Sequence, residues 1–315
     1  MHVVSRCLVL GGKGFIGSNL VRALGEAGHV VRSFDRPHLP ARSTVAGRAI
    51  EVEELEGDFA SDADIGQAVE GCDTCFHLVS TTLPKSSNLD PIFDVETNIM
   101  GTLRLLNHAV RAGLRKIIFV SSGGTVYGVP RSVPIEEGHP TDPICSYGIT
   151  KLAIEKYLHL FQELHGLDYA VLRVSNPYGE QQRTNASQGA VAVFLGKALR
   201  GEQIEIWGDG SVVRDYVHIS DVVSALAAAM SYAGKERVFN IGSGRGVSLN
   251  DLLNTIETAV GAAPRRVYTD KRSFDVPVSV LSIVRARREF GWAPEVRLQD
   301  GIARTVEWLR ASGEF

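Results

Sequence analysis

The stretch that decides the fold is residues 7–18, Cys7-Leu8-Val9-Leu10-Gly11-Gly12-Lys13-Gly14-Phe15-Ile16-Gly17-Ser18. A short apolar run leads directly into glycines spaced three apart and then into a helical pattern, which predicts a strand, a tight turn and a helix. Glycines are needed there because the backbone turns sharply and approaches a pyrophosphate, whose oxygens bind free N–H groups at the helix start. The stretch therefore predicts a dinucleotide site.

A second apolar strand, residues 29–34, ends at Asp35, about twenty residues beyond the glycines. A carboxylate at this position accepts hydrogen bonds from the hydroxyls of the adenosine ribose, which favours NAD as the cofactor. Arg36 could instead pair with the 2′-phosphate of NADP. Because Asp35 would repel that phosphate, we expect NAD.

Composition narrows the class of protein. Of the 315 residues, 44% are hydrophobic and 22% charged, and the formal net charge of -3 leaves no basic patch for nucleic acid. No apolar run reaches the length of a membrane span, and the first strand begins by Cys7 without room for a signal sequence, so we expect a cytoplasmic protein without a membrane partner. No second cysteine pair or histidine cluster completes a zinc site with Cys72 and Cys75, so no metal is expected.

Apolar runs alternate with helical patterns along the chain. This alternation predicts an α/β fold, a Rossmann-type doubly wound parallel sheet covered on both faces. We assign residues 1–176 to the NAD-binding domain, to which 216–242 return, and 177–315 mainly to a smaller, partly interleaved C-terminal substrate-binding lobe. The expected strands are 74–79, 116–122 and 168–174, the expected helices are 63–69, one opening at 98, 190–200 and 302–310, and the segments 222–229 and 238–241 are expected to return to the sheet domain.

Tyr147 and Lys151 are four residues apart, which on a helix places both side chains on one face. A phenol with a pKa near 10 is a poor base, and lowering that pKa by about 3 takes roughly 4 kcal/mol. A neighbouring ammonium and a cationic nicotinamide could supply this, so Tyr147 is the candidate general base. The pair follows the glycine turn, the acidic ribose partner and the strand end at Ser121 and Ser122 in the order that such a site requires.

In these motifs the chain resembles the extended short-chain dehydrogenase/reductase superfamily, in particular its nucleotide-sugar epimerases related to UDP-galactose (UDP-glucose) 4-epimerase. The resemblance covers nearly the whole chain. The matching elements are Gly11-x-x-Gly14-x-x-Gly17, Asp58-Phe59, His77-Leu78, Asn98 with Gly101-Thr102, 121–128, Tyr147 with Lys151, 173–177, Arg214-Asp215-Tyr216-Val217, Phe239-Asn240-Ile241-Gly242 and Phe290-Gly291-Trp292.

The resemblance implies a set of site residues. NAD is expected to contact Gly11, Gly14, Phe15, Ile16, Gly17, Asp35, Arg36, Asp58, Phe59, Leu78, Ser80, Asn98, Ser121, Tyr147, Lys151 and Pro177. The UDP-sugar is expected to contact Asn176, Ser279 and the diphosphate-binding pair Arg214 and Arg272, whose guanidinium groups match phosphate oxygens. The resemblance also implies a homodimer formed through the helices near 98–111 and 147–165.

The implied reaction is NAD-dependent 4-epimerisation of a UDP-sugar through a 4-keto intermediate, with Tyr147 handling the proton of the C4 hydroxyl. One position departs from the family pattern. The family carries Ser or Thr four residues before the Tyr of Val-Tyr-Gly, whereas this chain has Gly123, so Ser122 or Thr125 is expected to supply the hydroxyl. Dehydration and decarboxylation are disfavoured because no carboxylate stands at the matching positions.

Three matters stay open at this level. Another nucleotide-sugar oxidoreductase, either a 4-keto reductase or a dehydrogenase, is the alternative enzyme, and a non-catalytic NAD or nucleotide-sugar-binding protein is the alternative from another class. The nucleotide, the sugar and the pathway are open, the pathway between capsule or surface polysaccharide biosynthesis and sugar catabolism. Ser279 is small where relatives restricted to glucose and galactose often carry Tyr, which predicts room for N-acetylated sugars.

Overall fold

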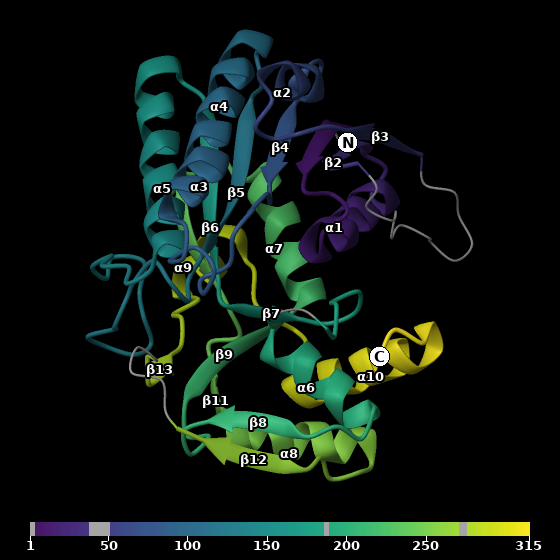
Figure 1. The fold of residues 1–315 in the computed structure, drawn as a ribbon. Coiled ribbons are helices and arrows are strands. Elements are labelled where there is room, and N and C mark those ends of the chain that lie inside the picture. The colour runs from purple at the N-terminus through teal and green to yellow at the C-terminus, as the bar shows by residue number, and fades with distance from the viewer. Residues whose placement is uncertain (1–3, 38–50, 186–188, 271–275) are drawn as a thin grey trace.

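A seven-stranded parallel sheet forms the centre of the larger lobe (Figure 1). The computed structural model describes residues 4–37, 51–185, 189–270 and 276–315. The strands are β1 (Arg6–Leu10), β2 (Val30–Asp35), β3 (Val52–Glu56), β4 (Thr74–His77), β5 (Lys116–Ser122), β6 (Asp168–Val174) and β10 (Val238–Ile241), in the order β10-β6-β5-β4-β1-β2-β3. This confirms the predicted doubly wound α/β fold.

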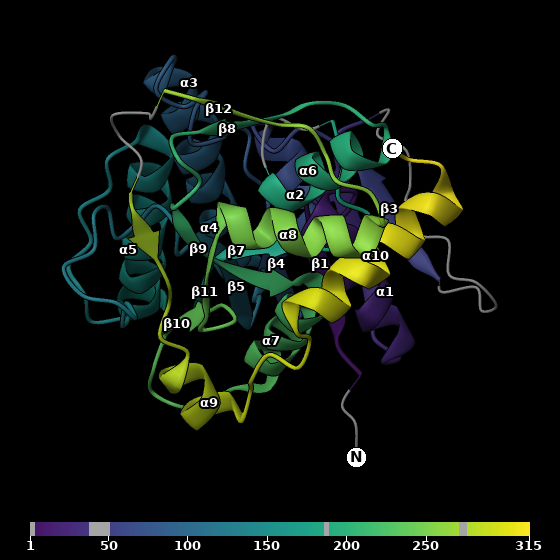
Figure 2. The same cartoon turned by 90° about the horizontal axis from the view of Figure 1, so that it is seen from below.

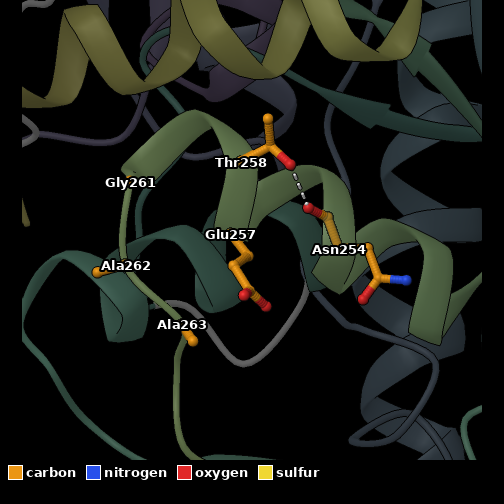
Figure 3. A pocket seen from close by; sticks show the side chains of 6 residues that line it. All are labelled: Asn254, Glu257, Thr258, Gly261, Ala262 and Ala263. Atoms are coloured by element: carbon orange, nitrogen blue, oxygen red, sulfur yellow. Dashed lines mark hydrogen bonds between the residues drawn. The ribbon is translucent and has the colours of Figure 1, made fainter.

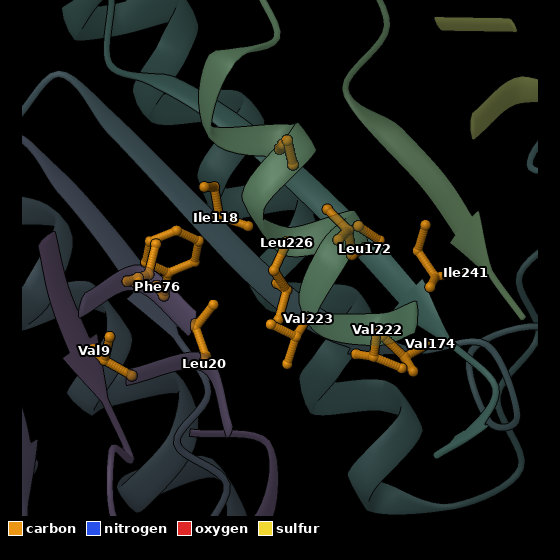
Figure 4. Close-up of a cluster of buried hydrophobic side chains, with 14 of the residues drawn as sticks. Val9, Leu20, Phe76, Ile118, Leu172, Val174, Val222, Val223, Leu226 and Ile241 are labelled. Atoms are coloured by element: carbon orange, nitrogen blue, oxygen red, sulfur yellow. The ribbon is translucent and has the colours of Figure 1, made fainter. Parts of the chain in front are cut away.

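Helices cover both faces of the sheet, which explains why its central strands are continuous apolar runs. On one face, α1 (Phe15–Glu26) and α7 (Ile219–Ser231) pack against the sheet through side chains such as Leu20, Val222 and Leu226 (Figure 4). On the other face lie α2 (Asp62–Val69), α4 (Gly101–Ala112) and α5 (Ser146–His165), which share a second apolar cluster with the sheet.

The strand order reverses direction between β1 and β4, and ligands of such sheets bind in the crevice outside the carboxyl ends of the strands at this point. The glycine turn leaves β1 there, and the segment after β4 begins beside it, because the Leu78 N–H donates to the Leu10 carbonyl at 3.0 Å. The fold therefore places the predicted dinucleotide turn at the expected edge.

A smaller lobe lies beyond this edge (Figure 1). Its strands are β7 (Asn176–Tyr178), β9 (Val213–His218), β11 (Gly246–Ser248) and β13 (Val278–Ser279) in one sheet, with β8 (Ile204–Trp207) and β12 (Arg266–Thr269) in another. The helices α6 (Ala190–Leu199), α8 (Leu249–Val260) and α10 (Leu298–Ser312) bury a third apolar cluster with these strands, and α10 crosses beside α8 in Figure 2. A short helix, α9 (Val284–Phe290), returns to pack against β10.

The structure differs from the sequence-based expectations in several elements. β3 was not expected, and β4 ends at His77 rather than at 79. The helix expected to open at 98 is preceded by α3 (Pro91–Asp94) and by η1, a π-helix over Val95–Met100. The segments 222–229 and 238–241 lie in α7 and β10, which pack with the larger lobe, and the division into two domains stays a prediction.

Two further findings concern the whole of the described chain. Within the described ranges, no helix is both long and apolar enough to cross a membrane. The four cysteines are unpaired, and Cys7, Cys72 and Cys75 are buried.

Candidate active site

The glycine turn is built so that two of its glycines cannot carry a side chain. Gly11 has a φ of +84°, a left-handed conformation that other residues rarely adopt. A Cβ on Gly17 would lie 2.0 Å from the Gly11 carbonyl oxygen, so the helix packs directly on the turn. The first turn of α1 has no side-chain cap, which leaves backbone N–H groups near Phe15 and Ile16 for an anion. These features fit the pyrophosphate of NAD.

The expected ribose carboxylate stands beside this turn. Asp35 accepts hydrogen bonds from the backbone N–H of Lys13 at 2.9 Å and of Arg36 at 2.8 Å. Arg36 itself is exposed. Asp35 is half-buried at the carboxyl end of β2, where a carboxylate can receive ribose hydroxyls.

The two residues expected at the adenine differ from each other. Asp58 is exposed, and its carboxylate accepts from the Ala60 N–H at 2.8 Å. Phe59 is only 5% exposed, with its ring 5.1 Å from that of His77, in the apolar cluster under α4. The Phe59 side chain therefore belongs to the core, which leaves its backbone for the predicted adenine contact.

Tyr147 and Lys151 lie on the first turns of α5, next to the end of β5. Lys151 Nζ donates to the Val120 carbonyl at 3.0 Å and lies 5.6 Å from the centroid of the Tyr147 ring. It also lies 4.7 Å from the centroid of Phe119. The structure thus brings the predicted pair together, with the ammonium held by the strand beneath it.

Burial dominates the protonation of both groups. Burial raises the pKa of Tyr147 to about 12, a hydrogen bond with the Ser80 side chain lowers it, and the charges of Cys145 and Asp94 raise it. Burial lowers the pKa of Lys151 to about 8, against the opposite effects of Asp94 and Glu155. In the protein alone, desolvation of the phenolate therefore outweighs its polar contacts. The predicted lowering of the Tyr147 pKa, which also requires a cationic nicotinamide, stays a prediction.

A buried carboxylate that the sequence analysis did not single out anchors α5. Asp94 is fully buried at the end of α3 and accepts hydrogen bonds from Ser146 Oγ at 2.7 Å and Thr150 Oγ1 at 3.3 Å, both on α5. It also accepts from Asn98 Nδ2 at 2.9 Å and from Thr82 Oγ1. Asp94 therefore joins the start of α5, where Tyr147 lies, to η1 and to the loop after β4.

The expected cofactor residue Asn98 takes part in the same cluster. Its Oδ1 accepts from the Thr81 N–H at 3.1 Å, and its Nδ2 donates to Thr81 Oγ1 at 2.9 Å. Ser80 is exposed next to Thr81, and Leu78 is half-buried. Asn98 lies on the π-helix η1, an irregularity frequent at functional sites, and it positions the loop that carries Ser80.

The structure gives a physical reason for the glycine at position 123. A Cβ there would lie 2.5 Å from Leu281 Cδ1, and Leu281 is 1% exposed. Leu281 arrives from the smaller lobe: its N–H donates to Asp215 Oδ2 at 3.2 Å, and it forms a β-bridge with Ile135. The leucine fills the space in which the Ser or Thr side chain of the family pattern would begin.

The nearby hydroxyls occupy different surroundings. Ser121 Oγ donates to Glu155 Oε1 at 2.6 Å, in a buried ion pair with Arg173, so this side chain faces α5. Strand alternation turns the half-buried Ser122 to the other side. Thr125 Oγ1 is buried and has no hydrogen-bond partner among the described residues. Which of Ser122 and Thr125 serves the reaction stays a prediction.

The expected substrate residues meet in the smaller lobe. Asn176 Nδ2 donates to the Asp215 carbonyl at 2.9 Å, and Pro177 follows it on β7, half-buried. Arg214 on β9 pairs in register with Ser279 on β13, and its Nη1 donates to the Val276 carbonyl at 2.7 Å. Ser279 is 8% exposed. Arg272 lies outside the described residues.

A separate hollow of about 500 Å³ lies at the C-terminal end of α8 (Figure 3). Its polar side chains are already engaged, since Thr258 Oγ1 donates to the Asn254 carbonyl at 2.9 Å and Glu257 accepts from Arg266 at 2.7 Å. It offers no group for the chemistry predicted at Tyr147.

Comparison with known proteins matches this geometry to one family. Residues 7–242 match the family described as NAD dependent epimerase/dehydratase. The UDP-glucose 4-epimerase of Mycolicibacterium smegmatis is 39% identical over 315 residues, covering 97% of this chain and 98% of that protein.

Two solved structures of UDP-glucose 4-epimerases have the same fold as this chain. The UDP-glucose 4-epimerase of Thermotoga maritima with UDP-glucose superposes with a TM-score of 0.91 at 37% identity, over 98% of this chain and 100% of that one. The UDP-glucose 4-epimerase of Thermus thermophilus in complex with NAD gives 0.89 at 33% identity, over 98% and 99%.

Proposed function

The chain belongs to the NAD-dependent epimerase/dehydratase family, and we propose that it catalyses the NAD-dependent 4-epimerisation of a UDP-sugar. The observation that carries the proposal is the Tyr147–Lys151 pair at the end of β5, set at the same sheet edge as the uncapped glycine turn. A base and a dinucleotide turn at one edge are the two parts that oxidation of a sugar hydroxyl needs.

Tyr147 and Lys151 have different roles in the proposed reaction. NAD held at the glycine turn and beside Asp35 would supply first the acceptor and then the donor of the C4 hydride, so that the sugar shows no net oxidation. Tyr147 takes the proton of the C4 hydroxyl as C4 loses its hydride, and it returns this proton to the same oxygen at the end. Lys151, held by the Val120 carbonyl, opposes the burial of Tyr147 by stabilising its phenolate electrostatically. A bound cationic nicotinamide ring would add to this effect, so we expect proton transfer by Tyr147 to depend on cofactor binding.

The experiment is a conversion assay on purified protein with UDP-glucose or UDP-galactose and no added cofactor. We expect interconversion, and we expect Tyr147→Phe to reduce turnover by about 10²–10⁴-fold, the usual contribution of a positioned proton-transfer group. Tyr157→Phe, on the same helix, is the matched control and should retain turnover. Normal turnover in Tyr147→Phe would refute the assigned base, and absence of interconversion by the unaltered protein with added NAD would refute the function.

The substrate is held between the lobes in this proposal. Arg214 and Arg272 bind the diphosphate, and Asn176 contacts the nucleotide side of it. Ser279 is the strand neighbour of Arg214, so a substituent on the sugar next to the diphosphate would come close to it. Its small side chain supports a substrate range that includes N-acetylated sugars.

We also propose a homodimer in the cytoplasm. Ile149, Leu160 and Leu164 are exposed on α5, and Ile92 and Met100 are exposed on the neighbouring α3 and η1. An apolar surface of this kind marks a protein interface, and it includes the helices predicted to pair. Light scattering tests the dimer. The unpaired cysteines favour a reducing compartment such as the cytoplasm.

A further inference from the structure

A cluster of charges lies beside the glycine turn. The Lys13 side chain is 6% exposed, and its Nζ lies 2.8 Å from Glu56 Oε1 and 3.6 Å from Glu54 Oε2. Both glutamates belong to the edge strand β3. Because side chains alternate along a strand, Glu54 and Glu56 share one face. Glu53 points to the other face, where it pairs with Arg32 at 3.0 Å.

This cluster borders the position expected for the adenosine ribose. The Lys13 N–H donates to Asp35 Oδ2, so the Lys13 side chain starts next to that carboxylate. Asp35 and Glu56 are also partners in register between β2 and β3. An oxygen on the ribose 2′ position, bound to Asp35, would therefore lie close to Lys13 and to the end of β3.

The charges decide which dinucleotide can bind there. A 2′-phosphate carries close to two negative charges and needs cations as partners. Lys13 and the exposed Arg36 are the cations beside Asp35 in the described residues, and two carboxylates already engage the Lys13 ammonium. A phosphate would meet repulsion from Asp35 and would compete with Glu54 and Glu56 for Lys13.

We propose that Glu54 and Glu56 are specificity-determining residues that exclude NADP by engaging the Lys13 ammonium. The inference rests on the proposed use of NAD and extends it from Asp35 to the neighbouring strand. A role in cofactor specificity and a merely structural ion pair predict different experimental results. A pair that only held the edge strand in place would alter thermal stability without altering the preference between NAD and NADP.

Calorimetric titration of the full chain, first freed of bound dinucleotide, with NAD and with NADP tests the proposal. We expect Glu54→Gln with Glu56→Gln to tighten NADP binding by about tenfold or more, because Lys13 gains a free charge, and to change NAD binding by less than about threefold. Lys13→Met added to this double variant should remove the gain. Glu53→Gln, a charge removed from the other face of the same strand, is the matched control and should leave the ratio of the two dissociation constants unchanged.

A thermal melt on each protein checks folding, and Glu56→Gln alone, which retains the Glu54 contact, serves if the double variant does not fold. An unchanged ratio in a folded variant that still binds NAD would overturn the inference and leave the proposed function intact. The same gain in Glu53→Gln, or a gain that survives Lys13→Met, would also overturn it. Failure of the unaltered protein to bind either dinucleotide would refute the cofactor assignment and this inference together.

Discussion

Replacing Lys151 by Met should make the protein more stable and much less active at neutral pH. The side chain is 5% exposed, and burial lowers its pKa from 10.5 to about 8. Keeping the ammonium charged in this buried position therefore lowers the free energy of unfolding by about 3 kcal/mol. Met fills the same volume but leaves the Val120 carbonyl without its donor, which costs about 1–3 kcal/mol. The net gain at pH 7 is therefore about 0–2 kcal/mol.

The pH dependence separates this reasoning from other effects of the substitution. The unfolded chain keeps the Lys151 proton up to about pH 10.5, whereas the folded chain releases it near pH 8, so the original protein gains stability between these values. The advantage of Lys151→Met should shrink by about 2 kcal/mol between pH 7 and pH 9.5. Denaturant unfolding of dinucleotide-free protein at the two pH values measures it, with the exposed Lys156→Met on the same helix as the control. A difference that does not change with pH would refute the reasoning.

Three further predictions concern neighbouring positions. Gly123→Ser should lower stability by about 1–3 kcal/mol, because its Cβ meets Leu281; in thermal unfolding, Gly123→Ser with Leu281→Ala should lose less stability than the sum of the two single variants, because the shorter side chain at 281 relieves the contact. Asp94→Asn should lower stability by about 2–4 kcal/mol and reduce turnover, because an amide N–H₂ would face the hydroxyl and amide donors that now bind the carboxylate. Denaturant unfolding measures the loss of stability, and initial rates measure the loss of turnover. Ser279→Tyr should suppress turnover of N-acetylated UDP-sugars while sparing UDP-glucose; equal loss on both would show that position 279 does not set the pocket size.

The sequence predicts a helix or strand well when the residues of that element are themselves apolar enough to require burial. β5 and β6 were predicted at their observed bounds because each is an apolar run buried on both sides. β3 was missed because Val52–Glu56 holds three glutamates in five residues. It is a strand because it pairs with β2 and because Arg6, Arg32 and Lys13 bind its carboxylates, contacts that no local pattern reveals.

The residues of the candidate site also fall into two groups, those that a local sequence pattern predicts and those that only the folded structure brings together. The Tyr147–Lys151 pair follows from helical spacing, and the glycine turn from its motif. Asp94 belongs to no such pattern, and its importance arises only because α3 packs against the first turn of α5. The raised pKa of Tyr147 in the protein alone has a related cause, because helical spacing predicts the neighbouring ammonium while only the folded structure shows the burial of the phenol.

The contact between Gly123 and Leu281 constrains how this chain can evolve. The two positions are far apart in the sequence, yet a Cβ at position 123 would lie 2.5 Å from Leu281 Cδ1, so the two side chains compete for one space. A hydroxyl at position 123 alone would crowd Leu281, and a smaller side chain at 281 alone would leave a cavity beside Gly123, so each single change destabilises the fold and the two changes together partly compensate. Packing therefore couples the two positions, and we expect them to vary together among descendants of this chain.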